Sequence, residues 1–139
     1  MSTEIQPTTR LELRTLVEEF NWKLDHAEPE GFADLFTPDG SFAAGPKEHV
    51  GHEALAAFAA ARTAQPKLSR TMVCNHRLVA ADDDHIGGAV QYILFMKDED
   101  APQSTEIFAV GEYSDEYTRT SDGWRIAKRT SRQVFQRAS

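Results

Sequence analysis

The sequence predicts an α+β fold in which a strongly curved antiparallel sheet packs against helices on one face. Residues 107–117 and 124–135 are strand-like, with β-branched and aromatic residues in partial alternation, and Asp122 with Gly123 provides the tight turn of a hairpin. Apolar residues recur at helical spacing near the N-terminus. Helices that precede a long hairpin are typical of a bent sheet that encloses a pocket.

The length and charge of the chain limit its organisation and its partners. With 139 residues we expect a flexible arm over residues 1–9 and one domain over residues 10–136. The formal net charge of -7 disfavours nucleic acid and anionic membranes as partners, because both require a positive field. The polar N-terminus and the lack of a long apolar run predict a cytoplasmic protein.

The first helix is predicted over residues 11–26. Thr9 and Glu12 can form a capping box at its start, and Pro29 and Gly31 lie beyond its end. Its apolar residues share one face, which indicates packing on the sheet. These residues are Leu13, Leu16, Val17, Phe20 and Leu24.

Two further helices are predicted, which makes three N-terminal helices in all. Residues 31–36 read as a short second helix that the segment TPDG ends. After a short strand at 41–44 and the loop GPKEHVGHE, the alanine-rich residues 53–62 form the third, and their small side chains suit close packing against a sheet.

Two strands over residues 69–80 and 86–96 follow, with Asp82, Asp83 and Asp84 as their turn. The second strand is apolar on both faces except at Gln91, so we expect it between the pocket and a partner surface. An uncovered apolar sheet face is an association site, and this predicts a homodimer.

The last strand carries a basic stripe, which we interpret as a solvated face or a ladder of cross-strand ion pairs. Its members are Arg125, Lys128, Arg129 and Arg132. We expect Arg129 to be structural, with Asp115 or Asp39 as its partner.

No motif for a metal or a cofactor is present. The only closely spaced histidines are His49 and His52, and both a Gly-rich phosphate loop and a G-x-S-x-G elbow are absent. Cys74 is the only cysteine and lies in an apolar run, which indicates an inert residue. We therefore expect no metal and no cofactor.

The order of elements and three segments resemble the SnoaL-like branch of the nuclear-transport-factor-2-like (NTF2-like) superfamily. The segments are DHAEPEGFADLFTPDGSF (25–42), SRTMVCNHRLVAADDD (69–84) and GEYSDEYTRTSDGWRIAKR (111–129). The resemblance implies a cone-shaped barrel, a deep apolar pocket between the first helix and the concave sheet, and a homodimer formed through the convex face. Members include polyketide cyclases, scytalone-type dehydratases, ketosteroid isomerases, epoxide hydrolases and non-catalytic ligand-binding domains.

The resemblance also indicates a site. Dehydratase- and cyclase-like members place a catalytic aspartate near the end of the first helix, where this chain has Asp25. They often carry a histidine for acid-base chemistry where this chain has Thr71. His76 could substitute only if the strand is bulged, because strict alternation places it on the opposite face from Thr71.

The residues themselves leave two interpretations open for each candidate. Asp25 flanks the apolar helix face, so its carboxylate is either a general base in a cavity or a solvated group. Asn75 shares a strand face with Thr71 under strict alternation and binds either a ligand or the backbone. His76 and Tyr92 either serve proton transfer and oxyanion binding or are core residues.

Four aromatic residues are expected to line the pocket or belong to the core. They are Trp22, Phe58, Phe108 and Tyr113.

The leading hypothesis is a cofactor-independent enzyme that acts on a small hydrophobic carbonyl compound. Asp25 would remove a proton α to the carbonyl, Tyr92 or His76 would hydrogen-bond the enolate, and Asn75 with Thr71 would orient polar substituents. Dehydration, isomerisation and aldol-type cyclisation all pass through that enolate, so all three stay open. The alternative is a non-catalytic small-molecule-binding or dimerisation domain, which the threonine at position 71 favours.

Overall fold

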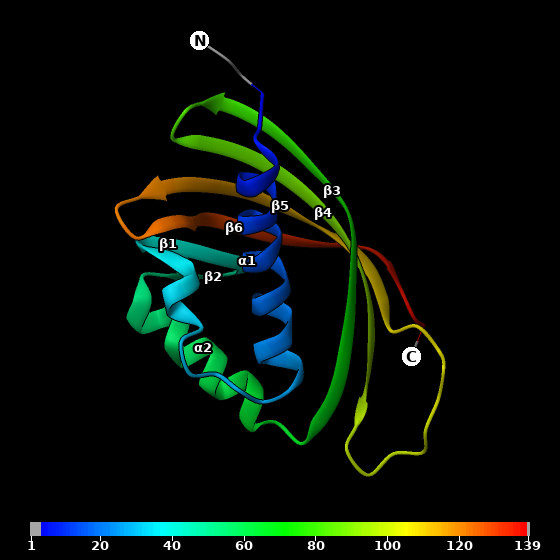
Figure 1. Cartoon of the computed structure of the whole chain (residues 1–139). Coiled ribbons are helices and arrows are strands. Elements are labelled where there is room, and N and C mark those ends of the chain that lie inside the picture. Colours follow the sequence, from blue (N-terminus) through cyan, green and yellow to red (C-terminus); the bar gives the residue numbers. More distant parts are fainter. Residues whose placement is uncertain (1–3, 139) are drawn as a thin grey trace.

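In the computed structural model, which describes residues 4–138, six strands form one sheet that bends around the first helix (Figure 1). The elements are α1 (Pro7–Asp25), the 3-10 helix η1 (Ala33–Leu35), β1 (Phe36–Ala44), β2 (Lys47–Val50), α2 (His52–Ala64), β3 (Lys67–Asp82), β4 (His85–Asp98), β5 (Ala109–Thr120) and β6 (Gly123–Gln136). Both α-helices lie on the concave side of the sheet (Figure 1). No helix in this part of the chain is long and apolar enough to cross a membrane.

The strands lie in the order β2-β1-β6-β5-β4-β3, so the C-terminal hairpin forms the middle of the sheet. Four neighbouring pairs are antiparallel as predicted, whereas β1 runs parallel to β6. The prediction of a wholly antiparallel sheet is therefore wrong at this pair. Local patterns cannot show it, because β1 and β6 lie at opposite ends of the chain.

The described residues contain two α-helices, and the prediction of three N-terminal helices is wrong. Residues 31–36 form only the short η1 and the first residue of β1. The segment at residues 45–53 that we expected to be a loop contains strand β2. Helix α2 therefore follows two strands and is not part of an N-terminal group of helices. The TPDG segment lies inside β1 at a register shift, and a Cβ on Gly40 would come within 2.8 Å of the Cβ of Phe36. Gly40 thus allows a close approach of the backbone in an irregular strand, whereas we expected this segment to end a helix.

Helix α1 begins at Pro7, inside the segment that we expected to be a flexible arm, and residues 1–3 of that arm lie outside the described residues. Proline suits the first helical turn because its missing N–H would have no partner there. The expected capping box does not form, since the N-cap residue is Gln6. Glu12 instead accepts a hydrogen bond of 2.8 Å from the backbone N–H of Trp124. This bond ties α1 to β6.

The core lies between α1 and the concave face of the sheet. The predicted apolar face of α1 is buried, and the ring of its residue Phe20 lies 5.1 Å from that of Phe42 and 5.7 Å from that of Tyr113. Trp124 and Ile126 are buried on the sheet, as the hairpin alternation predicts. Aromatic side chains therefore surround the space in which a pocket can form.

A β-bulge in the middle of β3 changes which residues face the core. Cys74 pairs with Gln91 and Arg77 with Ala89, so Asn75 and the residue after it oppose a single residue of β4. Asn75 has a φ of 56°, a left-handed conformation that asparagine tolerates better than most residues. Because of this extra residue, odd-numbered side chains face the core before the bulge and even-numbered ones face it afterwards.

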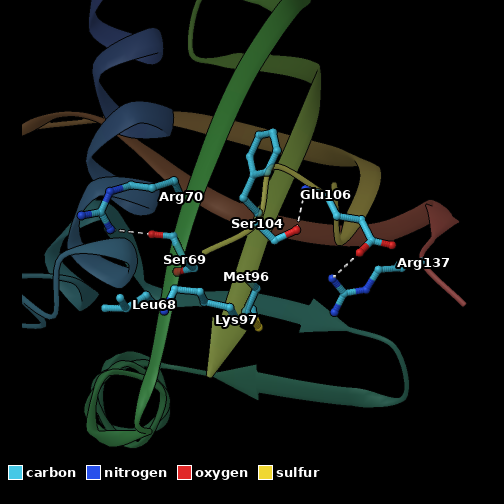
Figure 2. A pocket seen from close by; sticks show the side chains of 9 residues that line it. Leu68, Ser69, Arg70, Met96, Lys97, Ser104, Glu106 and Arg137 are labelled. Carbon is cyan, nitrogen blue, oxygen red and sulfur yellow. Dashed lines mark hydrogen bonds and ion pairs between the residues drawn. The ribbon is translucent and has the colours of Figure 1, made fainter. Parts of the chain in front are cut away.

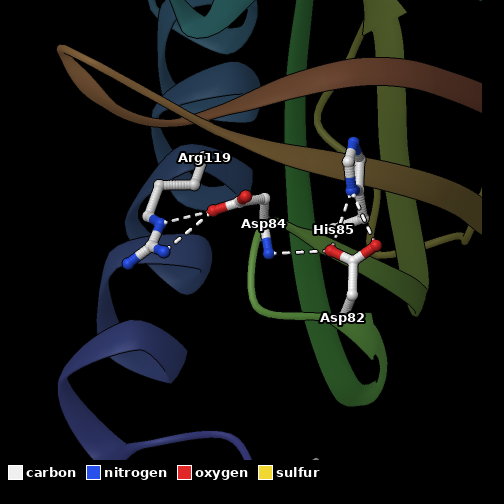
Figure 3. Close-up of polar contacts among 4 residues, drawn as sticks. All are labelled: Asp82, Asp84, His85 and Arg119. Carbon is white, nitrogen blue, oxygen red and sulfur yellow. Dashed lines mark hydrogen bonds and ion pairs between the residues drawn. The ribbon is translucent and has the colours of Figure 1, made fainter.

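The turn between β3 and β4 is fixed by its own side chains (Figure 3). The Oδ1 atom of Asp82 accepts a hydrogen bond of 2.8 Å from the backbone N–H of Asp84 and lies 2.9 Å from Nδ1 of His85. These contacts lower the pKa of the Asp82 carboxyl. Arg119 of β5 donates two hydrogen bonds to Asp84, at 3.0 and 2.8 Å. The predicted turn is confirmed, and the arginine attaches it to the neighbouring strand.

Candidate functional site

A pocket of about 230 Å³ lies between α1 and the concave face of the sheet, and we call it the inner pocket. Its walls are mainly apolar, with polar groups from five elements. The apolar side chains include Phe20, Leu24, Phe42, Phe58, Leu94 and Tyr113. The polar ones are Asn21, Asp25, Arg62, Thr71, Tyr92, Ser131 and Gln133.

Asp25, the last residue of α1, holds a half-buried carboxylate in the wall of this pocket. Its Oδ1 accepts hydrogen bonds from the hydroxyls of Ser69 at 2.7 Å and Thr71 at 3.2 Å, and its Oδ2 accepts one from the Thr71 backbone N–H at 2.8 Å. A carboxylate offers about four acceptor positions, so roughly one stays open for a substrate. The donors hold the group in one orientation and pin the end of α1 to β3.

Tyr92 also lines the inner pocket, and its hydroxyl lies 3.0 Å from that of Ser131, with either as the donor. The hydroxyl of Tyr113 instead donates to Oδ1 of Asn21 at 2.9 Å, and burial raises its pKa. The Tyr113 proton is therefore engaged in the core. Tyr92 is the phenol of this pocket that can turn its proton toward a ligand.

Of the nine residues that the sequence singled out, the structure brings five together around the inner pocket. They are Asp25, Phe58, Thr71, Tyr92 and Tyr113. The other four lie elsewhere, for different reasons.

Trp22, Asn75 and Phe108 do not line the inner pocket, which corrects the prediction. Trp22 is 52% exposed and stacks on His26 at a centroid distance of 3.7 Å. Asn75 is exposed at the bulge, where its Nδ2 donates to Oε1 of Gln91 at 2.6 Å. Phe108 precedes β5 and lies under the guanidinium of an arginine near the C-terminus.

His76 faces the core, because the bulge reverses the alternation, yet it does not reach the inner pocket. Its Nε2 lies 3.0 Å from the hydroxyl of Tyr117, which donates to Oδ2 of Asp115 at 2.5 Å. The Tyr117 proton is thus engaged, so Nε2 of His76 is the donor of their bond. Burial lowers the pKa of His76, and its Nδ1 is buried without a hydrogen-bond partner among residues 4–138. This histidine belongs to a hydrogen-bond network with Tyr117 and Asp115 and not to the inner pocket.

Arg129 is fully buried, so the basic stripe is not wholly the solvated face or ladder that we expected. Its guanidinium donates to both oxygens of Asp115, at 2.8 and 2.6 Å, which confirms the expected partner. The same group lies 4.6 Å from the ring centre of Phe20 and 4.0 Å from that of Tyr113. The Asp115 pairing raises the pKa of Arg129 despite its burial. Arg129 thus supports two aromatic walls of the pocket.

A second pocket of about 280 Å³ lies near the start of β3 and the end of β4 (Figure 2). Its cations have partners in the protein. Lys97 donates to three backbone carbonyls within 3.3 Å, and Arg137 pairs with Glu106 at 3.5 Å. We place the candidate site in the inner pocket, where a carboxylate and a phenol converge.

Five polar residues of the inner pocket and its wall were missed in the sequence, namely Asn21, Arg62, Ser69, Ser131 and Gln133. Arg62 lies four residues after Phe58 on α2, and Ser69 lies two residues before Thr71 on β3, so helical and strand spacing could have found them. Ser131 could be identified only from the register of β5 and β6, which places it opposite Tyr113.

The comparison with protein families gives one match. The profile of the SnoaL-like domain matches residues 7–130. The chain belongs to the SnoaL-like family. A search of curated protein sequences gave no significant match.

Solved structures share the fold over nearly the whole chain. An NTF2-like protein with a cystatin-like fold from Novosphingobium aromaticivorans is 20% identical, covering 94% of this chain and 85% of that chain, with a TM-score of 0.77. A proposed scytalone dehydratase from the same organism is 16% identical (96% and 92%, TM-score 0.79). ActVI-ORFA from Streptomyces coelicolor is 20% identical (90% and 96%, TM-score 0.76). These likenesses establish an NTF2-like fold.

Proposed function

We propose that this protein is a cofactor-independent enzyme that converts a small hydrophobic carbonyl compound through an enolate. The observation that carries the proposal is that the Asp25 carboxylate and the Tyr92 hydroxyl line one aromatic-walled pocket. A carboxylate beside an apolar pocket can serve as a general base, and a phenol can hydrogen-bond the oxyanion. The SnoaL-like family and the fold shared with a proposed scytalone dehydratase support this proposal.

In the proposed reaction the Asp25 carboxylate takes the proton α to the carbonyl. The C–H electron pair becomes the carbon–carbon π bond of the enolate, and the carbonyl π electrons move to the oxygen. Tyr92 donates a hydrogen bond to that oxygen. Asp25 then returns its proton to another carbon in an isomerisation or to a departing hydroxyl in a dehydration. One acid-base group suffices, so a histidine at position 71 is not required.

The test compares Asp25→Asn with the parent protein on a panel of cyclic ketones and β-hydroxy carbonyl compounds. Asparagine keeps the shape of the side chain but cannot take the proton, so kcat should fall by a factor on the order of 10² to 10⁴. Ligand affinity, measured by calorimetry, should change much less. Glu48→Gln on the exposed face of β2 is a matched control and should keep the parent rate. Turnover of a substrate by Asp25→Asn at the parent rate would exclude the catalytic role.

A non-catalytic ligand-binding domain is the second candidate, and the hydrogen bonds around Asp25 favour it. Ser69 and Thr71 already occupy three acceptor positions of the carboxylate, and Thr71 stands where related enzymes often carry a histidine. In this case Asp25 joins α1 to β3. Saturable ligand binding without turnover of any compound in the panel would support this candidate.

A further inference from the structure

Arg62 is the feature of the inner pocket that the proposed reaction does not use. It lies in the last turn of α2, is half-buried, and is the one cationic side chain among the described residues that line this pocket. Its Nη2 donates to the hydroxyl of Ser69 at 3.0 Å, and that hydroxyl donates to Asp25. One hydroxyl therefore connects the cation to the carboxylate in the wall of the pocket.

The guanidinium of Arg62 makes no direct ion pair with any described residue. Among residues 4–138 none of the ion pairs includes it, whereas the buried Arg129 has both oxygens of Asp115. Its hydrogen-bond partner, Ser69, is neutral. A guanidinium has five N–H donors, so most of them are open to a ligand. The oxygens of Asp25 are directed to Ser69 and Thr71 instead.

We propose that the inner pocket binds a small monocarboxylate, with the carboxylate of the ligand on Arg62 and its hydrocarbon ring against the aromatic walls. A planar guanidinium binds a carboxylate through two parallel hydrogen bonds, and an apolar surrounding strengthens them. Arg62 offers one cationic partner, which suits a ligand with a single carboxylate. The pocket is smaller than the range of about 300–1,000 Å³ typical of larger ligands, so a ligand with one ring fits best.

This inference rests on the proposed function for the reactive half of the ligand, and it narrows the substrate to a keto or hydroxy acid. With its carboxylate on Arg62, such a ligand places its carbonyl group among Asp25 and Tyr92. Asp25 adds a like charge nearby, but its oxygens are held toward their three donors on β3. The pairing therefore sets the orientation of the substrate as well as its affinity.

The test measures binding of two matched probes, 4-oxocyclohexanecarboxylate and its neutral amide, by calorimetry at low salt. A hydrogen bond to a charged group is worth about 1.5–3 kcal/mol, so the parent protein should bind the acid roughly 10- to 100-fold tighter than the amide. Arg62→Gln should remove this preference and leave the affinity for the amide nearly unchanged. Arg62→Lys should keep part of it, because the charge remains while the planar fork is lost.

Arg132→Gln is the matched control, because it makes the same change of charge at an exposed residue of β6. It should keep the parent preference. Equal affinity of the parent protein for both probes would overturn the proposal, and so would an equal loss of preference in Arg62→Gln and Arg132→Gln. The Asp25→Asn turnover experiment is independent of this binding test. If the parent protein prefers the acid but its turnover does not depend on Asp25, the catalytic function is rejected and the proposed class of ligand stands.

Discussion

At the scale of single residues, the site depends on side chains that are held in place by close neighbours. Two residues of β3 orient the Asp25 carboxylate, and Gly111 of β5 leaves room for the ring of Tyr92. A Cβ atom on Gly111 would overlap that ring and the backbone oxygen of Arg132. The glycine is therefore required by a close approach inside the pocket.

We predict that Gly111→Ala displaces Tyr92 and disturbs the pocket. Overpacking of this kind typically costs about 1–3 kcal/mol of unfolding free energy, which urea denaturation measures. Ligand affinity should fall in parallel. Gly87→Ala is the control, because a Cβ there lies 3.8 Å or more from its nearest atoms. Equal stability of the two variants would contradict this account.

At the scale of elements, the buried Arg129–Asp115 pair joins β6 to β5 across the floor of the core. Both side chains are fully buried, and their strands pair directly at these residues. Tyr117 and His76 extend the same network to β3. The network therefore couples three strands of the sheet behind the pocket.

We predict that Arg129→Met destabilises the fold by about 3–5 kcal/mol, because it leaves the Asp115 charge buried without its partner. The double variant Arg129→Met with Asp115→Asn should recover part of this loss, since no charge then remains. Urea unfolding of both variants provides the measurement. A double variant no more stable than the single one would argue against an electrostatic origin.

We predict that His76 makes stability depend on pH. Burial lowers its pKa below the ordinary 6.5, with Arg129, Arg14 and Arg10 adding to that effect and Asp115 opposing it. The unfolded chain then binds more protons, so the contribution is present above about pH 6.5 and is lost as pH falls below it.

Comparison with His76→Gln isolates this effect, because glutamine keeps an N–H donor and does not titrate. Between about pH 7.5 and pH 5 the parent protein should lose more unfolding free energy than the variant, by on the order of 1 kcal/mol or less, given the partial exposure of the side chain. Parallel pH profiles would refute the prediction.

At the scale of the whole molecule, the convex face of the sheet carries an apolar row across four strands. Met72, Ile93, Val110 and Phe135 are cross-strand partners in β3, β4, β5 and β6, and Met72 and Phe135 are 52% and 67% exposed. No element in the described part of the chain covers this row, since both α-helices lie on the concave side (Figure 1). We propose that a second copy of the chain covers it.

We predict that the protein sediments as a dimer at micromolar concentration and that Val110→Glu converts it to a monomer. A charge in the middle of an apolar interface is costly when it is buried without a partner. Leu11→Glu, on the 66% exposed outer face of α1, should leave the dimer intact. A monomeric parent protein would exclude the proposed association.

The sequence by itself determined the apolar face of α1 and the β5–β6 hairpin. These features follow from local periodicity, because side chains repeat on one face every 3.6 residues in a helix and every two residues in a strand. The resemblance to the SnoaL-like family added the NTF2-like arrangement of these parts. Residue types and spacing were sufficient here because each feature depends on close neighbours in the chain.

Only the tertiary structure decided the rest. One left-handed residue, Asn75, inserts a bulge that reverses the faces of β3, so a one-residue slip moves Asn75 outward and His76 inward. The parallel β1–β6 pair and the contacts of Asp25 with Ser69 and Thr71 join segments far apart in the chain, and the burial of Arg129 depends on Phe20 of α1 packing over it. Their partners are set by the global packing of the sheet, which local sequence patterns do not encode.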